Sequence, residues 1–199
     1  MPHISYVDPA SIEDPEIAAI IERARILGTP RPESQAIRAH NPAVMKAFNH
    51  AWETFFRQGE VDHAVKELCR LYISKSVDCE YCGGQRSVTA AALGTTEDQV
   101  DEILAFETSD RFDERERAAL TWTMAIAWDA GLADEQTWEK LHRHFSEAQL
   151  IELGHFIALT LGQQRMLKTI GIKHGEVLAD TTAGLAPAEA AKISSSAAG

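Results

Sequence analysis

The feature that most constrains the fold of this 199-residue chain is its helical periodicity. Apolar residues recur every three or four positions along most of the sequence, and no stretch shows the alternation of a half-buried strand. Helix-start signals precede these segments, so we expect helices that begin near Asp14, Asn41, Asp62, Cys79, Thr96, Asp113, Asp134 and Ser146. Because the gaps between them are short, the sequence predicts an all-α, single-domain bundle of about seven or eight helices.

The two ends of the chain differ from this periodic region. Residues 1–13 lack a strong apolar period, and we expect them to form an N-terminal arm. Beyond residue 175 the chain becomes rich in small residues that have little apolar surface to bury, which predicts a flexible tail over residues 176–199. The helical domain is therefore expected over residues 14–175.

The composition limits the class of partner. A formal net charge of −11 argues against nucleic acid and against an anionic membrane surface, since no basic patch offsets it. The N-terminal sequence lacks the basic region and apolar core of a secretory signal. No apolar run approaches the roughly 20 residues that span a bilayer. We therefore expect a cytoplasmic protein that does not bind a membrane.

One short stretch, residues 66–86, contains all three cysteines of the chain. Cys79 and Cys82 form a Cys-x-x-Cys pair, which in a cytoplasmic protein points to redox chemistry or to a metal. Zinc sites need four ligands and usually two such pairs, but the chain has no second pair. We therefore predict no metal and no other cofactor. Two buried thiols with a purely structural role stay open as an alternative.

The position of the pair favours thiol–disulfide chemistry. We expect Asp78 to cap a helix that begins at Cys79 and runs to Gly94. The N-terminus of such a helix stabilises a thiolate and lowers its pKa from about 8.5 toward roughly 3.5–7.5. Cys79 and Cys82 are three residues apart, so one helical turn brings them within reach of a disulfide. Glu67 is a candidate acceptor for a thiol proton, and Arg86 a candidate to support the thiolate charge.

These residues resemble a known family. Glu67, Cys79 and Cys82, in the segment E-L-C-R-L-Y-I-S-K-S-V-D-C-E-Y-C, are similar to the core motif of the alkylhydroperoxidase D and carboxymuconolactone decarboxylase superfamily. The resemblance covers roughly residues 30–175. It implies a helical subunit that assembles into trimers, hexamers or related homo-oligomers. In the peroxidase branch, it implies that Cys82 attacks a hydroperoxide or other small-molecule substrate, that Cys79 resolves the product as a disulfide, and that a thiol or disulfide reductant protein is the partner.

The chain departs from the family pattern at one position. The resemblance implies a proton relay from Glu67 through a histidine four residues after the second cysteine, but Arg86 stands there. An arginine cannot shuttle a proton near neutral pH. His155, in the last expected helix, is a candidate to replace that histidine by folding over the cysteine helix.

The leading hypothesis from the sequence is a thiol-dependent antioxidant oxidoreductase of the peroxidase or peroxiredoxin type. One alternative is a carboxymuconolactone decarboxylase-like lyase that acts on a small lactone acid. That chemistry does not call for a cysteine pair. Another alternative is a non-enzymatic oligomeric member of the family with a vestigial site.

Overall fold

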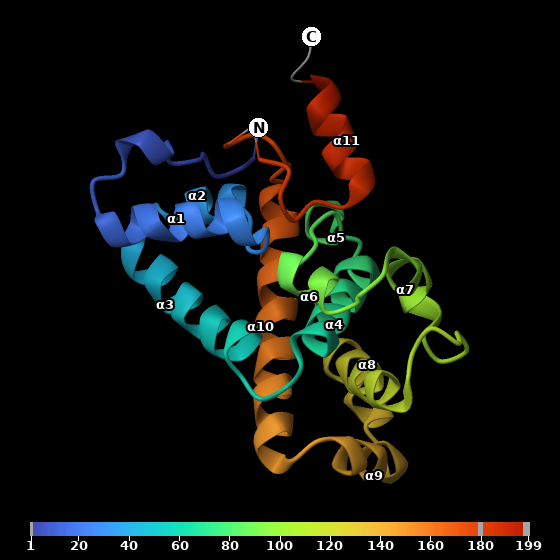
Figure 1. Cartoon of the computed structure of the whole chain (residues 1–199). Helices are drawn as coiled ribbons and strands as arrows, with labels where there is room; N and C mark the ends of the chain where they lie inside the picture. The colour runs from blue at the N-terminus through green and yellow to red at the C-terminus, as the bar shows by residue number, and fades with distance from the viewer. Residues whose placement is uncertain (1, 179–180, 197–199) are drawn as a thin grey trace.

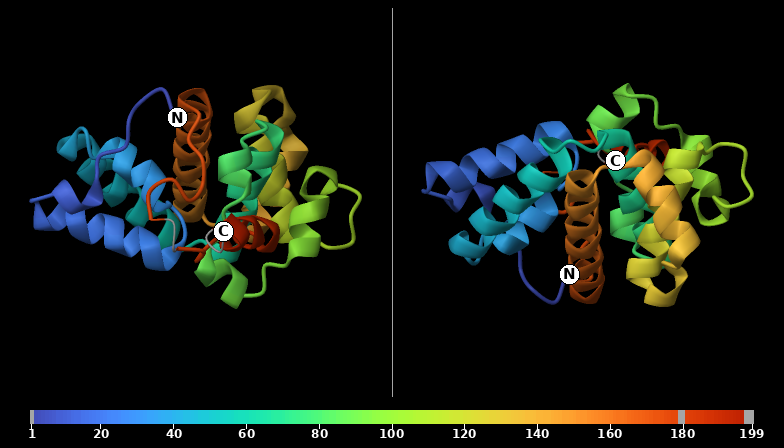
Figure 2. Two further views of the ribbon diagram at one scale, coloured as in Figure 1. Left: turned by 90° about the horizontal axis from the view of Figure 1, so that it is seen from above. Right: turned by 90° about the horizontal axis from the view of Figure 1, so that it is seen from below.

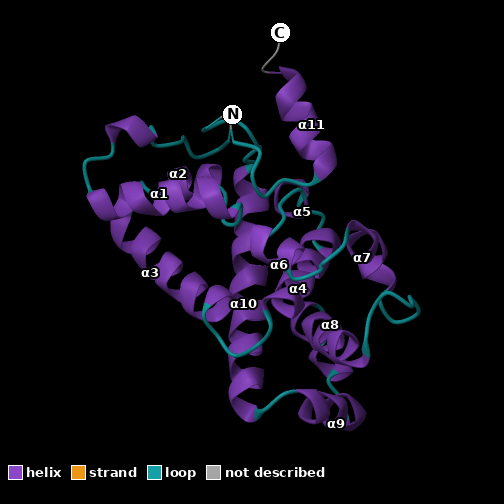
Figure 3. Ribbon diagram, in the orientation of Figure 1, coloured by secondary structure: helices purple, strands orange, loops and turns teal. Residues whose placement is uncertain are grey.

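The computed structural model describes residues 2–178 and 181–196, and within them every regular element is a helix (Figure 3). The all-α prediction is confirmed. The described residues form eleven α-helices rather than seven or eight, because several of them are short. The α-helices are α1 (Pro15–Leu27), α2 (Pro32–Arg38), α3 (Pro42–Trp52), α4 (His63–Ser76), α5 (Glu80–Gly83), α6 (Val88–Ala92), α7 (Glu97–Glu102), α8 (Glu114–Ala127), α9 (Glu135–His144), α10 (Glu147–Ile170) and α11 (Pro187–Ser196). In this described part, none of them is both long enough and apolar enough to cross a bilayer.

The long helix α10 runs through the centre of the molecule, next to α4 (Figure 1). Helices α1, α2 and α3 lie on one side of α10, and α7, α8 and α9 lie on the other, as the two views of Figure 2 agree. The short helices α5 and α6 follow α4 near the C-terminal end of α10. This arrangement places the cysteine pair at the junction of the two sides.

Most helices begin where the sequence predicts, because their cap residues satisfy the free N–H groups of the first turn. Asp14 and Asn41 each accept a backbone hydrogen bond at the start of α1 and α3. Complete capping boxes form at Thr96, Asp113 and Ser146, ahead of α7, α8 and α10. Local side-chain chemistry therefore determines these boundaries.

Helix α4 is the centre of the core. Ten consecutive residues, 65–74, are buried all around it. One set of its apolar side chains packs with α8 and α10, and a second set, with Leu68 and Tyr72, packs against Val100 and Phe106. Because so few positions of α4 reach solvent, the charged residues on it must find partners inside the protein.

The prediction of one continuous helix from Cys79 to Gly94 is wrong. The structure contains the four-residue α5 and the separate α6, with residues 84–87 between them. Asp78 has a positive φ of 53° and does not cap α5; Cys79 does. Backbone carbonyls near the end of α5 accept hydrogen bonds from arginine side chains, as described below, and this supports the break in the helix.

The described part of the expected flexible tail, residues 176–178 and 181–196, makes specific contacts, and the expectation for residues 179–180 and 197–199 lies outside the described residues. The fully buried guanidinium of Arg31 donates hydrogen bonds to the carbonyl oxygens of Thr181 (3.0 Å) and Ala183 (2.8 Å). Backbone hydrogen bonds then join residues 184–186 to the loop after α5, and α11 follows. We call residues 181–186 the docked segment. The sequence does not predict this docking, because the segment has few apolar side chains and its backbone carbonyl groups make the contacts.

Candidate functional site

Cys79 and Cys82 form a disulfide at the turn that follows α4. The Cys79 N–H donates to the carbonyl oxygen of Ser74 (2.9 Å), and the Cys82 N–H lies 3.3 Å from the Cys79 sulfur as the first turn of α5 begins. Their Cα atoms are 5.3 Å apart, a usual separation for a disulfide. Both residues are 3% exposed and pack with Leu167 and Ile170 of α10. The two sulfur atoms are therefore bonded to each other and packed against the C-terminal part of α10.

A buried ion pair on α4 holds this turn in place. Arg70 and Glu67 form two hydrogen bonds, Nε to Oε2 at 2.6 Å and Nη2 to Oε1 at 2.7 Å, and both residues are at most 2% exposed. The same guanidinium donates to the carbonyl oxygens of Cys82 (2.9 Å) and Gln85 (2.8 Å). Arg70 thus links the central helix directly to the backbone of the cysteine turn, with its charge compensated by Glu67.

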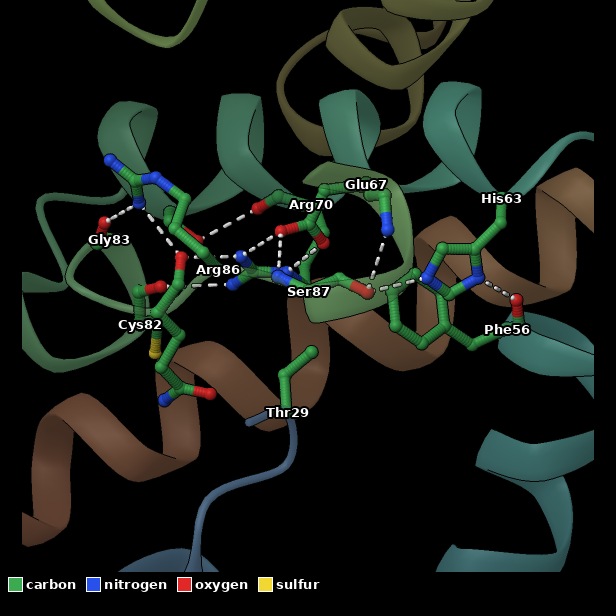
Figure 4. Close-up of polar contacts among 12 residues, drawn as sticks. Thr29, Phe56, His63, Glu67, Arg70, Cys82, Gly83, Arg86 and Ser87 are labelled. Carbon is green, nitrogen blue, oxygen red and sulfur yellow. Dashed lines mark hydrogen bonds and ion pairs between the residues drawn. The ribbon is translucent and has the colours of Figure 1, made fainter. Parts of the chain in front are cut away.

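Glu67 accepts its hydrogen bonds from Arg70 and from the backbone N–H of Ser87, at 2.8 Å. Figure 4 shows the Cys82 sulfur on the side of the turn that faces Thr29, with Glu67 and Arg70 on the opposite side. In this arrangement Glu67 positions the cysteine turn through Arg70. Its expected role as acceptor of a thiol proton stays a prediction.

His63 and Ser87 extend this network away from the cysteines. His63 Nδ1 lies 2.8 Å from the carbonyl oxygen of Phe56, so Nδ1 carries the hydrogen and donates it. The other ring nitrogen lies 2.7 Å from the Ser87 hydroxyl, which donates to it in this neutral tautomer. Desolvation by burial lowers the pKa of His63 and so favours the neutral ring. His63 therefore fixes the start of α6 relative to α4.

Arg86 lies beside the cysteine turn but its guanidinium is directed at other groups. It forms two hydrogen bonds with the carboxylate of Glu97, at 2.8 and 2.9 Å, and donates to the carbonyl oxygens of Gly83 (2.6 Å) and Gln85 (2.8 Å). These bonds hold the pKa of Glu97 below its usual value. Arg86 thus joins α7 to the end of α5, and Figure 4 shows its bond to Gly83. Its expected support of a thiolate stays a prediction.

Within the single chain His155 does not lie over the cysteine helix, and its expected relay role stays a prediction. His155 is exposed, its Nδ1 lies 2.8 Å from the carbonyl oxygen of Ile151, and its ring packs beside Phe55. Cys82 instead packs with Leu167 and Ile170, which lie more than ten residues further along α10. About three helical turns of α10 separate His155 from Leu167. The apolar periodicity of α10 does not predict which of its turns contacts the cysteines.

The two cysteines face different spaces. Cys79 lines an open groove of about 980 Å³, together with Tyr81, His174 and Glu189. Cys82 lines a small, partly open cavity of about 10 Å³ on the side of Thr29 and α10. Of these two spaces, the groove beside Cys79 is the one with room for a large molecule.

His174 forms part of the wall of this groove. Its ring stacks on that of Tyr81, with centroids 4.4 Å apart, and desolvation lowers the pKa of His174 to about 4. The Tyr81 hydroxyl donates to Glu33 (3.2 Å), which also pairs with the buried Arg31. The groove wall is thus tied to the guanidinium that holds the docked segment.

Several residues of the site were not predicted from the sequence. Arg70 and Arg31 are buried polar residues whose partners lie far away in the chain or in the cysteine turn. The sequence does contain an indication of such residues: a charged or amide side chain on the apolar face of a helix is buried and therefore needs a buried hydrogen-bond partner. Among the described residues, no three His, Cys, Asp or Glu side chains are grouped so that they could hold a metal ion.

Comparisons with known proteins agree with this geometry. Residues 42–125 match the model of the carboxymuconolactone decarboxylase family, and this segment includes Glu67, Cys79 and Cys82. An uncharacterized protein of Mycobacterium tuberculosis strain H37Rv is 30% identical over 115 residues, which are 57% of this chain and 40% of that protein. The Bacillus subtilis strain 168 protein YdfG, also uncharacterized, is 22% identical over 102 residues, 51% of this chain and 69% of that one. The match thus spans less than half the length of the mycobacterial relative.

Solved structures share the fold. A peroxidase-related protein of Ralstonia eutropha JMP134, described as an alkylhydroperoxidase AhpD core, has a TM-score of 0.71 at 18% identity over 86% of this chain and 91% of its own. The debrominase Bmp8, in a cysteine-to-alanine variant with bound 2,3,4-tribromopyrrole, has a TM-score of 0.66 at 21% identity, covering 98% of this chain and 99% of its own.

The chain has the all-α fold of the alkylhydroperoxidase D core, with a Cys79–Cys82 disulfide in the turn after α4. Its similarity to the carboxymuconolactone decarboxylase family extends over residues 42–125, which are less than half of the chain.

Proposed function

We propose that this protein is a thiol oxidoreductase that reduces hydroperoxides through its Cys79–Cys82 couple. The observation that carries the proposal is the disulfide itself, because two thiols held at this spacing can give up two electrons without a change of fold. Cys82 is the attacking thiolate and Cys79 the resolving thiol. A dithiol reductant then regenerates the couple by attack from the open groove, which Cys79 lines.

Thiol counting tests the proposal. The reduced protein is mixed with one equivalent of hydroperoxide, and the remaining thiols are alkylated to stop the reaction. The mass of the intact chain is then measured by mass spectrometry. We expect the loss of two thiols per chain and a Cys79–Cys82 disulfide, with Cys82→Ser abolishing peroxide consumption. Cys69→Ser is the matched control, since Cys69 is buried and free, and it should retain full consumption. Unchanged peroxide consumption by Cys82→Ser would overturn the proposal.

A second candidate is reductive dehalogenation of a small aromatic molecule. The similarity to a debrominase over nearly the whole chain favours it. The open groove beside Cys79 has the volume for such a substrate. Release of bromide from 2,3,4-tribromopyrrole by the reduced protein, faster than its hydroperoxide turnover, would select this candidate. Lactone turnover that survives loss of both cysteines would instead select the decarboxylase alternative.

A further inference from the structure

The cavity beside Cys82 is small and its wall is mostly polar. It measures about 10 Å³, close to the least space that holds one water-sized molecule. Besides Cys82 it is lined by Arg70, Gln85 and Gln164, and by the apolar Leu167. Among molecules that can form hydrogen bonds, those with one or two non-hydrogen atoms come nearest to this size, and hydrogen peroxide is the smallest hydroperoxide.

Gln164 of α10 presents an unused hydrogen-bond acceptor at this cavity. Gln164 is 2% exposed, and its Nε2 donates to the carbonyl oxygen of Arg70 at 3.1 Å. Since a carbonyl can only accept, this bond fixes which end of the amide faces Arg70. The other end, Oε1, is buried and has no hydrogen-bond partner among the described residues. A buried acceptor without a donor is costly, so Oε1 is suited to an O–H group that enters the cavity.

Of the neighbouring amides, Gln163 accepts a hydrogen bond at Oε1 from Arg38 at 2.8 Å. Gln85 donates through Nε2 to the carbonyl oxygen of Tyr81 at 3.3 Å, and its oxygen is not among the buried side-chain atoms left without a partner. Gln164 is therefore the amide lining this cavity whose oxygen is both buried and without a hydrogen-bond partner among the described residues.

We propose that this cavity is the oxidant subsite, that it selects hydrogen peroxide over bulky alkyl hydroperoxides, and that Gln164 binds the peroxide. The inference rests on the proposed function. Hydrogen peroxide has an O–H group at each end, so one end can donate to Gln164 Oε1 while the other oxygen meets the Cys82 sulfur. An alkyl hydroperoxide carries its single O–H group on one oxygen and a carbon chain on the other, for which the cavity has no room.

The reaction balances with the groups present. The Cys82 thiolate attacks the near oxygen, so that an S–O bond forms, the O–O bond breaks, and the departing hydroxide takes a proton from solvent to leave as water. The Cys79 thiol then attacks the Cys82 sulfenic acid. The S–S bond forms, the S–O bond breaks, and a second water leaves. Two thiols are oxidised, one peroxide is reduced, and a dithiol reductant restores the pair.

Single-turnover kinetics test the inference without a reductant. The reduced protein is mixed with hydrogen peroxide or with tert-butyl hydroperoxide, and disulfide formation is followed by rapid quench and intact mass. We expect the second-order rate constant to be at least tenfold larger for hydrogen peroxide. Gln164→Met, which keeps the volume but removes the amide, should lower the constant for hydrogen peroxide about tenfold and leave that for tert-butyl hydroperoxide unchanged. The exposed Gln136→Leu is the control and should change neither constant.

The outcomes separate the two proposals. If Gln164→Met lowers both constants equally, or lowers only the midpoint of urea unfolding, Gln164 holds a structural water and the inference is overturned. If the unaltered protein reacts faster with tert-butyl hydroperoxide than with hydrogen peroxide, the cavity does not select the smaller oxidant and the inference is overturned. Disulfide formation with both oxidants at equal rates overturns the inference and leaves the proposed function standing. No thiol oxidation by either oxidant overturns both.

Discussion

Arg70 is the residue through which the helical core controls the cysteine turn. Its guanidinium is shared between the carboxylate of Glu67 and the carbonyl oxygens of Cys82 and Gln85. A guanidinium suits this role because its planar set of five donors can serve a carboxylate and two carbonyls at once. Glu67 thus acts here by compensating the buried positive charge of Arg70. The position of the Cys82 sulfur depends on both residues.

Loss of the Glu67 charge should therefore destabilise the protein strongly. In Glu67→Gln the buried Arg70 loses its counter-charge, and breaking such a pair costs about 3–5 kcal/mol. We expect the free energy of unfolding in urea to fall by that amount and the rate of disulfide formation to fall with it. Arg111→Gln is the matched control. Its partners are Asp98 and Glu102, and all three side chains are at least 46% exposed, so the change should stay within about 0.5 kcal/mol. Equal effects of the two substitutions would contradict the role of the buried pair.

The three thiols should differ sharply in reactivity. Cys69 is fully buried, and desolvation raises the pKa of its thiol to about 12, so at pH 8 only about one molecule in 10⁴ carries the thiolate. In the reduced native protein we expect iodoacetamide to modify Cys79 first, because Cys79 lines the open groove, then Cys82, and to spare Cys69. Peptide mass spectrometry after timed quenching measures this order, and alkylation in urea should label all three. If iodoacetamide labels Cys69 in the native protein as fast as it labels Cys79, the predicted order of reactivity is wrong.

At the scale of the elements, boundaries set by local chemistry could be predicted and those set by distant partners could not. Capping boxes at Thr96 and Ser146 act within four residues, so the sequence contains the whole interaction. The break between α5 and α6 depends on carbonyl groups that bind Arg70 and Arg86, and the docked segment depends on Arg31. These arginines lie up to 152 residues from the groups that they hold, and no local pattern shows such pairing.

The docked segment meets the loop before α2 at two glycines. Gly28 and Gly184 both have positive φ, 75° and 69°, and a Cβ added to either one would overlap backbone atoms of the other. Gly184→Ala should therefore detach the segment and free the Arg86 N–H, which donates to the Gly184 carbonyl oxygen at 2.8 Å. Hydrogen exchange should show the loss of protection at the Arg86 amide, with about 1–3 kcal/mol lost from the stability of the segment.

The control for this substitution lies in α10. A Cβ added at Gly162 meets no atom within 4 Å, and alanine is the better helix former by about 1 kcal/mol. Gly162→Ala should leave the protection of the Arg86 amide unchanged and hold or raise the stability of the protein. If Gly184→Ala also leaves that amide protected, the docking of residues 181–186 does not depend on the close approach of the glycines.

At the scale of the whole molecule, the sequence predicted the helical class, the similarity to the carboxymuconolactone decarboxylase family and the cysteine pair, but not the spaces that surround the site. The motif residues Glu67, Cys79 and Cys82 were recognisable because their spacing follows from one helix and one turn. The groove beside Cys79 and the cavity beside Cys82 arise from α10 and the docked segment, which approach from distant parts of the chain. The predictions of a homo-oligomer and of a reductant protein concern other molecules and stay predictions.

The groove wall should also make the folding of the whole molecule sensitive to pH. His174 is held against Tyr81, and burial lowers the pKa of His174 to about 4, against about 6.5 in the unfolded chain. The charges of Glu33, Arg31 and Glu189 face it, and desolvation outweighs them. Between pH 6.5 and 4 the unfolded chain therefore binds a proton at His174 that the folded protein does not.

The sign of the effect follows from that difference. The contribution of His174 to the free energy of unfolding is fully present above about pH 6.5 and is lost as the pH drops toward 4. The loss amounts to about 3 kcal/mol, since one pKa unit corresponds to about 1.4 kcal/mol. His174→Phe keeps a ring over Tyr81 but cannot titrate, so urea unfolding across pH 4–7 should show a shallower decline for this variant. The pKa of His63 is lowered in the same direction, and its contribution is common to both proteins and cancels in the comparison. Parallel stability curves for the two proteins would show that the His174 ring takes up its proton without leaving the groove wall.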